Sequence, residues 1–419
     1  MRVGICLIFG WLLCLPLWAG GHITGALQRN IRSVQVYNPG TSTRQPVISL
    51  GSNEQLVLSF DDLNSSQSTY SYRFYHCNRF GEVDDLSDSE FIDGFANGYL
   101  DEYLYSFNTY MTYTHYSLRF PNEDCRFKVS GNYLLRVFED NDEDKPVLNA
   151  VFQVVEPKME IQALATARTD ISYQRDYQQV QLDLLYPNYR INSPDRELFV
   201  LVRQNGRYDN AVWVDSPNYV EHGKAVYRHH KNLIFEAGNT YRVFDISSQH
   251  VLSERVESIT YHAPYYHVTL YPDELRTSRE YDYIRDVAGR YRVNLQYSEH
   301  PEIEADYYFT HFNLPVGQAL DGEVYLSGEL TGWKLDEAAR MSYNPQTQAY
   351  EHILLLKQGG YNYQYLFVPA GSGQAQTALI EGNKWQTANE YSIYVYHRSF
   401  GGRYDRLIGY QLIHANQQP

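Results

Sequence analysis

Beyond its first residues, the chain has no long apolar run. One apolar stretch extends from Ile5 to Leu17, and no later stretch comes near the ~20 apolar residues that a membrane-spanning helix needs. Direct membrane insertion of the mature protein is therefore not expected. The early stretch follows Arg2 and precedes small residues at 19–21, a pattern typical of a secretory signal peptide over residues 1–19. We expect an exported protein.

Positive charge is also scarce. The chain holds 35 Lys plus Arg against 50 Asp plus Glu, a formal net charge of −15, and its basic residues are spread singly. Such a surface repels nucleic acid and anionic lipid, because both carry negative charge. Nucleic-acid binding is therefore excluded as a main function.

Catalytic and metal-binding motifs are missing as well. The sequence has no Gly-X-Ser-X-Gly elbow, no phosphate-binding glycine loop before a helix, and no His-Glu-X-X-His motif. The adjacent His229 and His230 would point to opposite faces of a strand, which spoils them as a pair of metal ligands. We predict no catalytic residue, no metal and no cofactor, while the many separate carboxylates leave a glycosidase-type pair open.

An acidic run at residues 139–144 starts like a calcium-binding loop. The pattern then fails, because Lys145 stands where a glycine is required and Val151 where a bidentate glutamate is required. We expect a solvated hairpin tip there. His76 and His115 lie in dense aromatic strands and are expected to be hydrogen-bonded core histidines.

Cysteine is rare, with four residues, and two of these lie inside the leader. Leu13 precedes Cys14, where a lipoprotein would need a small residue, so lipid anchoring is not expected. Cys77 and Cys125 remain in the mature chain. In an exported protein they form either a disulfide or two separate thiols, each buried in its own sheet face, and both alternatives stay open.

Tyrosine, in contrast, is abundant, with 40 Tyr against 5 Trp. Its ring packs on a pleated, half-buried surface while its hydroxyl finds a polar partner. Alternation with period two dominates the chain, and apolar residues at helical spacing are almost absent. An all-β fold is therefore predicted. A surplus of exposed tyrosine would also suit a protein-binding surface.

A weak internal repeat indicates how the strands are grouped. A glycine followed closely by a tyrosine opens a strand at 131–133, 238–241, 289–291 and 359–361. In immunoglobulin-like sandwiches a tyrosine at this place bonds back to the backbone, and the glycine permits the tight entry. We predict tandem β-sandwich domains, immunoglobulin-like or early-set-like. Prolines at 157 and 264 mark the boundaries of three domains, 27–157, 158–263 and 264–419.

The C-terminal unit resembles known carbohydrate-binding modules. Residues 324–333, Met341, and the strands at 350–355 and 359–365 are similar to starch-binding and glycogen-binding modules, which are β-sandwiches. Trp333 matches the first tryptophan position of that family, but the usual Asp-Gly turn is missing and the next tryptophan is Trp385. The resemblance implies sugar binding by Trp333 and Trp385 as an alternative function, with a core role for Trp333 as the other expectation.

Passages spread over the whole mature chain are similar to one further family. They are residues 30–35, 75–78, 105–109, 113–118, 130–133, 381–387 and 404–410. Their order resembles that of the plug proteins of the Bacteroidetes type IX secretion system, with one departure at Arg79-Phe80-Gly81. The resemblance implies a non-enzymatic plug in the periplasm, at the inner face of the outer membrane. It would bind the outer-membrane translocon barrel, close its periplasmic opening, and act as a monomer within a hetero-complex. The alternative is an envelope polysaccharide-binding protein.

The aromatic passage at 99–116 is the place where a partner contact is predicted. Alternation puts Tyr113 and His115 on one face and Thr114 and Tyr116 on the other, and only one face can be core. Exposed aromatic side chains with few lysines are typical of protein interfaces. We predict Tyr113 and His115 on or beside the partner surface. Burial of both faces, between the sheet and a neighbouring domain, is the alternative.

Overall fold

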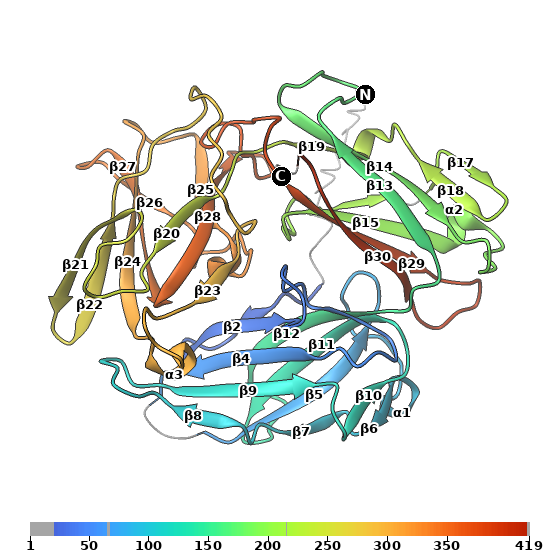
Figure 1. Cartoon of the computed structure of the whole chain (residues 1–419), viewed down its shortest axis with the longest axis horizontal. Helices are drawn as coiled ribbons and strands as arrows, with labels where there is room; N and C mark the ends of the chain where they lie inside the picture. The colour runs from blue at the N-terminus through green and yellow to red at the C-terminus, as the bar shows by residue number, and fades with distance from the viewer. Residues whose placement is uncertain (1–20, 65–67, 215, 417–419) are drawn as a thin grey trace, which may run out of the picture.

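The computed structural model describes residues 21–64, 68–214 and 216–416. Its strands form three units, each with its own hydrophobic core, and the units meet at the middle of the molecule (Figure 1). The all-β, tandem β-sandwich fold is confirmed. The leader expected at 1–19 lies outside the described residues.

The first unit is a sandwich of two sheets and a small two-stranded sheet. Its elements are β1 (Gly25–Ala26), β2 (Ile31–Tyr37), β3 (Val47–Ser49), β4 (Leu56–Asp62), β5 (Tyr70–Cys77), α1 (Asp88–Phe91), β6 (Ile92–Gly94), β7 (Asn97–Tyr99), β8 (Tyr103–Tyr105), β9 (Thr114–Phe120), β10 (Cys125–Phe127), β11 (Gly131–Glu139) and β12 (Pro146–Val155). The large sheets have the orders β1-β12-β11-β5-β7 and β2-β4-β9-β8, and β3 adds to β12 in parallel. The acidic run at 139–144 forms the β11–β12 turn, as expected.

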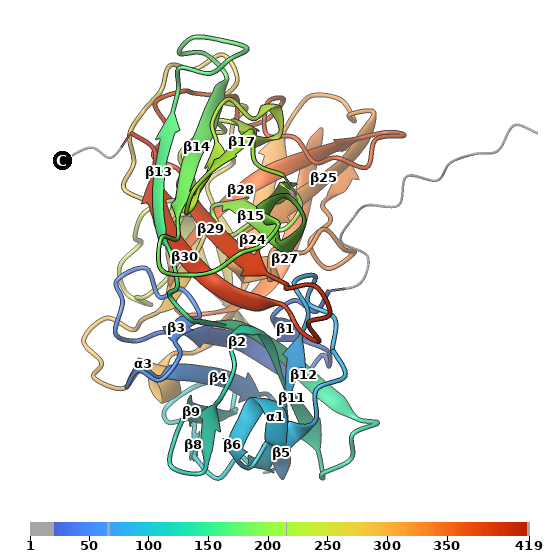
Figure 2. The ribbon, with the colours of Figure 1, turned by 90° about the vertical axis from the view of Figure 1, so that its right-hand side faces the viewer.

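The second unit is built from two separate stretches of chain. Its elements are β13 (Glu160–Thr166), β14 (Tyr177–Leu185), α2 (Pro194–Glu197), β15 (Leu198–Gln204), β16 (Val212–Val214), β17 (Tyr219–Glu221), β18 (Lys224–Tyr227), η1 (Lys231–Leu233), β19 (Ile234–Glu236), β29 (Glu390–His397) and β30 (Arg406–His414). One sheet is β13-β14-β18-β17, with β19 beside β14, and the other is β16-β15-β29-β30. Figure 2 shows β29 and β30 lying beside β13 and β15, although they come last in the sequence.

The third unit is inserted between these two stretches. Its elements are β20 (Arg242–Asp245), β21 (Val256–His262), β22 (Tyr265–Leu270), β23 (Tyr291–Val293), α3 (Pro301–Glu304), β24 (Tyr307–Pro315), β25 (Gly322–Ser327), η2 (Glu329–Thr331), β26 (Ser342–Asn344), β27 (Ala349–Lys357) and β28 (Gly359–Pro369). The sheets are β20-β28-β23, with β25 beside β28, and β21-β22-β24-β27-β26.

The sheet pairing therefore groups residues differently from the expected ranges 158–263 and 264–419. Ala263 and Pro264 form the turn between the paired strands β21 and β22, so this proline marks a hairpin and not a linker. The last two strands complete the second core through Tyr391, Ile393 and Ile408. Sequence order alone gives no signal for such an insertion.

The glycine–tyrosine repeat does place strand entries in the first and third units. The Tyr133 hydroxyl donates to the carbonyl of Val129 at 2.7 Å, and that of Tyr361 donates to the carbonyl of Lys357, each four residues back. These are the backbone bonds that a tyrosine corner makes. The repeat is therefore structural in the first and third units.

Candidate functional site

The aromatic passage lies where the first unit meets the third. The loop between β8 and β9 runs beside α3 (Figure 1). The Phe107 N–H donates to the Ile303 carbonyl at 2.9 Å, and the buried Asp306 carboxylate accepts the N–H groups of Tyr110 and Met111 at 2.8 and 3.0 Å. The loop is thus fixed by hydrogen bonds from the neighbouring unit.

Tyr113 is buried inside this contact, with 2% of its surface exposed. Its hydroxyl donates to the Ala305 carbonyl at 2.8 Å, and its ring packs edge-on against Tyr307. Burial, together with the nearby Asp61 carboxylate, raises the pKa of Tyr113, so the hydroxyl stays a donor. This placement matches two-sided burial between sheet and neighbouring domain, and it removes Tyr113 from any open partner surface.

His115 is half-buried in the same contact. Its Nδ1 lies 2.6 Å from Oδ1 of Asp61, so it supports the contact from within the first unit. His76 is fully buried, with Nδ1 2.5 Å from Asp84 and Nε2 3.3 Å from the Ser130 carbonyl. Both histidines have the hydrogen-bonded roles that their aromatic strands suggested.

A buried ion pair joins the first and third units. Nζ of Lys357, at the end of β27, lies 2.6 Å from Oδ2 of Asp61 on β4, and each side chain is 1% exposed. Tyr307 donates to the same carboxylate at 2.5 Å, and Lys357 also donates to the Glu302 carbonyl at 2.6 Å. The charge on each side is therefore fully hydrogen-bonded, as buried charges must be.

The electrostatics of this pair favour the ionised carboxylate of Asp61, whereas the net pKa of Lys357 is lowered. Burial raises the pKa of the Asp61 carboxyl, but Lys357 and His115 outweigh it and hold that pKa below its usual value. Burial lowers the pKa of Lys357, and Asp61 opposes that shift. Sequence reasoning missed both residues. The local signal was a charge at the end of an apolar strand, and nothing local links positions nearly 300 residues apart.

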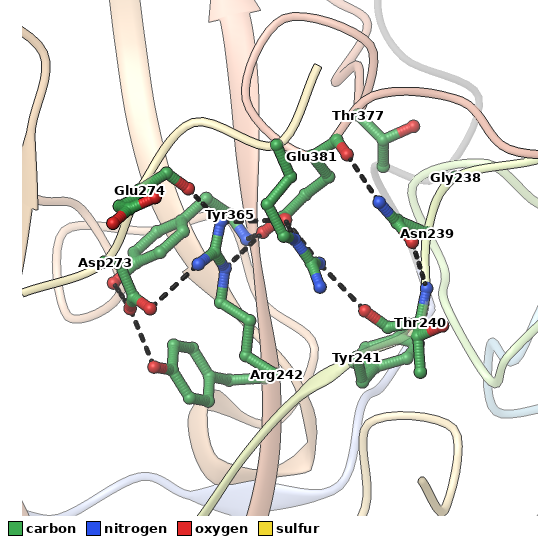
Figure 3. A network of polar contacts seen from close by, with 12 residues as sticks. Gly238, Asn239, Thr240, Tyr241, Arg242, Asp273, Glu274, Tyr365, Thr377 and Glu381 are labelled. Atoms are coloured by element: carbon green, nitrogen blue, oxygen red, sulfur yellow. Dashed lines mark hydrogen bonds and ion pairs between the residues drawn. The ribbon is translucent and has the colours of Figure 1, made fainter. Parts of the chain in front are cut away.

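A second buried network lies within the third unit, beside the two stretches of chain that connect it to the second unit (Figure 3). Arg242 binds both oxygens of Glu381, each at 3.0 Å, and donates to Asp273 at 2.8 Å. Burial lowers the pKa of Arg242, but the two carboxylates outweigh it and raise that pKa. Arg276 also donates to Glu381, at 2.7 Å, so the buried carboxylate is held by two guanidinium groups.

The same place brings together the two chain crossings between these units. One crossing, around Gly238 and Asn239, leads into β20, and the other, at 381–387, leads back to β29. Asn239 donates to the Glu381 carbonyl at 2.9 Å, and the Lys384 N–H donates to the Gly238 carbonyl at 2.7 Å. The passages at 238–241 and 381–387, both singled out in the sequence, thus lie side by side as the two connections between these units.

The first and second units meet through apolar packing and through ion pairs, one of which joins Arg403 to Glu90. A core cluster combines Val47 and Val155 with residues of β15, β29 and β30. Arg79, part of the departure from the family pattern, binds Asp405 at 3.0 Å, and Phe80 packs edge-on against Trp213. The departure therefore lies in the contact between these two units.

Neither tryptophan proposed for sugar binding is fully exposed. Trp333 is half-buried and packs edge-on against Tyr241. A Cβ added to Gly289 (φ +81°) would lie 2.3 Å from its ring, so the backbone there approaches the indole closely. Trp333 also borders a cavity of about 100 Å³ at the junction of the three units. Trp385 is half-buried at the second crossing, where its carbonyl accepts from Gln178.

Cys77 and Cys125 are two separate, buried, free thiols. Cys125 belongs to the first core, whereas Cys77 does not. Burial raises the pKa of each thiol to about 12. Of the two alternatives that the sequence left open, the structure has the separate thiols.

Exposed aromatic rings surround the outer edge of the contact between first and third units. Tyr105, Phe107 and Tyr110 of the first unit are 58%, 66% and 56% exposed, and Tyr261 of the third is 50% exposed. The Tyr110 ring lies 5.5 Å from that of Tyr261 and 4.9 Å from that of Tyr266. We call these five residues the aromatic surface. Three of the four exposed rings lie in the passage that the sequence singled out, but none of them is Tyr113 or His115.

Within the described residues, no cluster of three or more His, Cys, Asp or Glu side chains could hold a metal ion. No helix among them is long and apolar enough to cross a membrane.

Comparison with known proteins identifies a family for the first unit and a similar solved structure for most of the chain. Residues 31–156 match the model of the type 9 secretion system plug protein 1st domain. The crystal structure of a hypothetical protein from Parabacteroides merdae ATCC 43184 is 41% identical, with a TM-score of 0.92, and the match covers 94% of this chain and 99% of that chain.

Two other comparisons add nothing to this. The structure of Pseudomonas fluorescens alkylpurine DNA glycosylase AlkC, bound to DNA containing an abasic site analog, is 12% identical over 30% of each chain, with a TM-score of 0.17. At that score the similarity carries no argument. No curated protein matches the chain.

Proposed function

This chain belongs to the type 9 secretion system plug family, and from that premise we propose that it is a non-enzymatic periplasmic plug. It binds the outer-membrane translocon barrel and closes the barrel's periplasmic opening. The observation that carries the proposal is the way the three units are joined. Largely buried ion pairs hold the third unit to both of the others, Lys357 to Asp61 of the first unit and Arg290 to Glu390 of the second.

A cover over a wide aqueous opening must keep its shape. Separate domains on flexible linkers move relative to one another by default, unless their interface is extensive. Here the third unit is connected twice to the second and is held to the first by the Asp61–Lys357 pair. Such a body can close an opening without a cofactor or a catalytic residue.

The net charge of −15 fits a protein that faces water on the periplasmic side. The alternative of polysaccharide binding has less support. Trp333 packs against Tyr241 and Gly289, so its ring is not a free platform for a sugar.

Affinity purification tests this proposal. The full-length chain, tagged at the C-terminus and expressed in its own cells, is purified from detergent-solubilised outer membranes, and co-purifying proteins are identified by mass spectrometry. We expect the large translocon barrel, in near-equal amount to the plug. The untagged strain is the control. Purification of the chain without the barrel, in several mild detergents, would contradict the proposal.

A second readout measures closure directly. Deletion of the gene should make the cells more sensitive to antibiotics too large for ordinary porins, because an open barrel admits them. Unchanged sensitivity, with the barrel still present in the membrane, would contradict the closing role.

A further inference from the structure

We infer that the aromatic surface is the docking face of this protein for a basic segment of a protein partner, namely an Arg- and Lys-bearing periplasmic edge of the translocon barrel. The inference rests on the proposed function and adds the face and the chemistry of the contact. It replaces Tyr113 and His115, which the fold has buried or half-buried, with exposed residues of the same passage.

The first support is the exposure of aromatic rings, whose burial at an interface costs little side-chain conformational entropy. Phe107 and Tyr110 are each more than half exposed at the tip of the β8–β9 loop, and Tyr261 lies beside them on the third unit. Aromatic side chains are enriched in the energetic centres of interfaces, because two torsions fix a large contact area.

The second support is charge. Three segments carry the surface and its surroundings, 99–118, 256–271 and 293–315, and none contains a lysine or an arginine. Their exposed acidic residues are Asp101, Glu102, Glu257 and Glu299. Lys357, which approaches this contact from β27, is buried and paired. The surface is therefore acidic, and the complementary partner is basic. Guanidinium groups also bind the faces of exposed tyrosine rings.

The third support is rigidity. Asp306 accepts two backbone N–H groups of the loop, and the Phe107 N–H donates to α3. The rings on the two units face each other across a contact that the buried Asp61–Lys357 pair and these backbone hydrogen bonds hold together. The surface is thus continuous with an internal contact and pre-organised, which lowers the cost of binding.

The experiment compares three variants of the full-length tagged chain in the purification described above. The first is the double variant Phe107→Ala, Tyr261→Ala, with one change on each unit. The second reverses charge by Asp101→Lys, Glu102→Lys. The matched control is Phe400→Ala, Tyr173→Ala, because both of these aromatic side chains are more than half exposed on the second unit.

We expect the first variant to lower the recovered barrel by about tenfold, as loss of central aromatic anchors does. The charge reversal should lower it several-fold, with most of the effect lost at high salt because the ions screen the attraction. The control should change recovery less than twofold. All variants should keep the wild-type thermal midpoint, since each changed side chain is exposed.

The outcomes separate the two proposals. If the wild-type chain does not bring down the barrel, the proposed function fails, and the docking face fails with it. If the wild-type chain and the first variant bring it down equally, only the docking face is overturned. The same purified proteins are run in glucan affinity gels and by size-exclusion chromatography. Retardation or dimerisation that the first variant abolishes would assign the surface to a polysaccharide or a second copy and overturn the inference.

Discussion

The two contacts made by the third unit differ in how the chain supports them. Towards the second unit, two crossings lie side by side and bond to each other, and beside them, within the third unit, Arg242 and Arg276 hold the buried Glu381. Towards the first unit, a single lysine meets a single aspartate, and no chain connection helps them. The contact with the second unit is part of one continuous fold, whereas the contact with the first unit joins two units that each have a complete core.

This difference predicts different consequences for loss of a charge. A charge left alone inside a fold has no way to reach water without unfolding that region. A charge left alone between units can be hydrated when the units separate. A substitution in the Arg242 network should therefore lower the free energy of unfolding. A substitution in the Asp61–Lys357 pair should instead let the first and third units separate.

Replacement of Arg242 by alanine should have the largest effect. It leaves Glu381 with only Arg276 and removes an ion pair from Asp273, so the free energy of unfolding should fall by about 3–5 kcal/mol. Urea denaturation followed by circular dichroism measures this. Arg340→Ala is the matched control, because its ion pairs with Glu323 and Glu337 are exposed and screened by water, so their loss should change stability little. Equal effects of the two variants would contradict the distinction.

Replacement of Lys357 by methionine should loosen the arrangement instead. Asp61 loses its cation and becomes hydrated as the units separate, which limits the stability loss to about 3 kcal/mol or less. We expect faster amide hydrogen exchange in residues 106–113 and a larger radius of gyration. Arg242→Ala should not increase the radius before unfolding begins. A Lys357→Met protein as compact as the wild type would show that apolar packing alone fixes the units.

Acid should weaken the same contact. The folded-state pKa of Asp61 is held below its usual value, so its stabilising contribution is full above the unfolded pKa of about 4 and is lost as pH falls through the folded pKa. Hydrogen exchange of residues 106–113 should therefore accelerate below about pH 4. Because Glu381 also has a lowered pKa, the Asp61→Asn variant is needed as the reference. It should lack the part of the acid response that belongs to the contact.

The fold class could be predicted from the sequence because the pattern that marks each strand lies within that strand. Period-two alternation and the glycine–tyrosine entries depend on neighbours in the chain, and both tyrosine corners at Tyr133 and Tyr361 follow from them. The insertion of the third unit depends on β29 finding β15 across the whole inserted unit. No local pattern encodes that pairing.

The candidate site could be predicted only in part from the sequence, because it too depends on contacts between distant stretches of the chain. The aromatic passage at 99–116 could be recognised by composition, but which of its residues are covered depends on the third unit. Tyr113 is buried by Ala305 and Tyr307, whereas Phe107 on the same loop stays exposed. Alternation assigns faces of a strand and contains no information about a neighbouring unit.

Removing one tyrosine hydroxyl from each place compares the two, because the same kind of hydrogen bond to a carboxylate is lost in both. Tyr307 donates to Asp61 and Tyr363 donates to Asp273, and both hydroxyls are buried. A hydrogen bond to a charged group contributes about 1.5–3 kcal/mol, so Tyr363→Phe should lower the free energy of unfolding by that amount. Tyr307→Phe should lower it less and instead speed hydrogen exchange in residues 106–113. If both variants change only global stability, the two contacts respond alike and the distinction fails.

The smallest expected effect is that of reductant, which should change neither contact. Cys77 and Cys125 are free and lie within the first unit, so no disulfide between described residues constrains how the units meet. The thermal midpoint should be the same with and without dithiothreitol. In the native protein both thiols should react slowly with a thiol reagent at neutral pH, because they are buried and their pKa values are raised to about 12. After denaturation without reductant, two thiols per mature chain should titrate. A titration that finds none would mean that the exported protein oxidises this pair, and it would contradict the two free thiols of this structure.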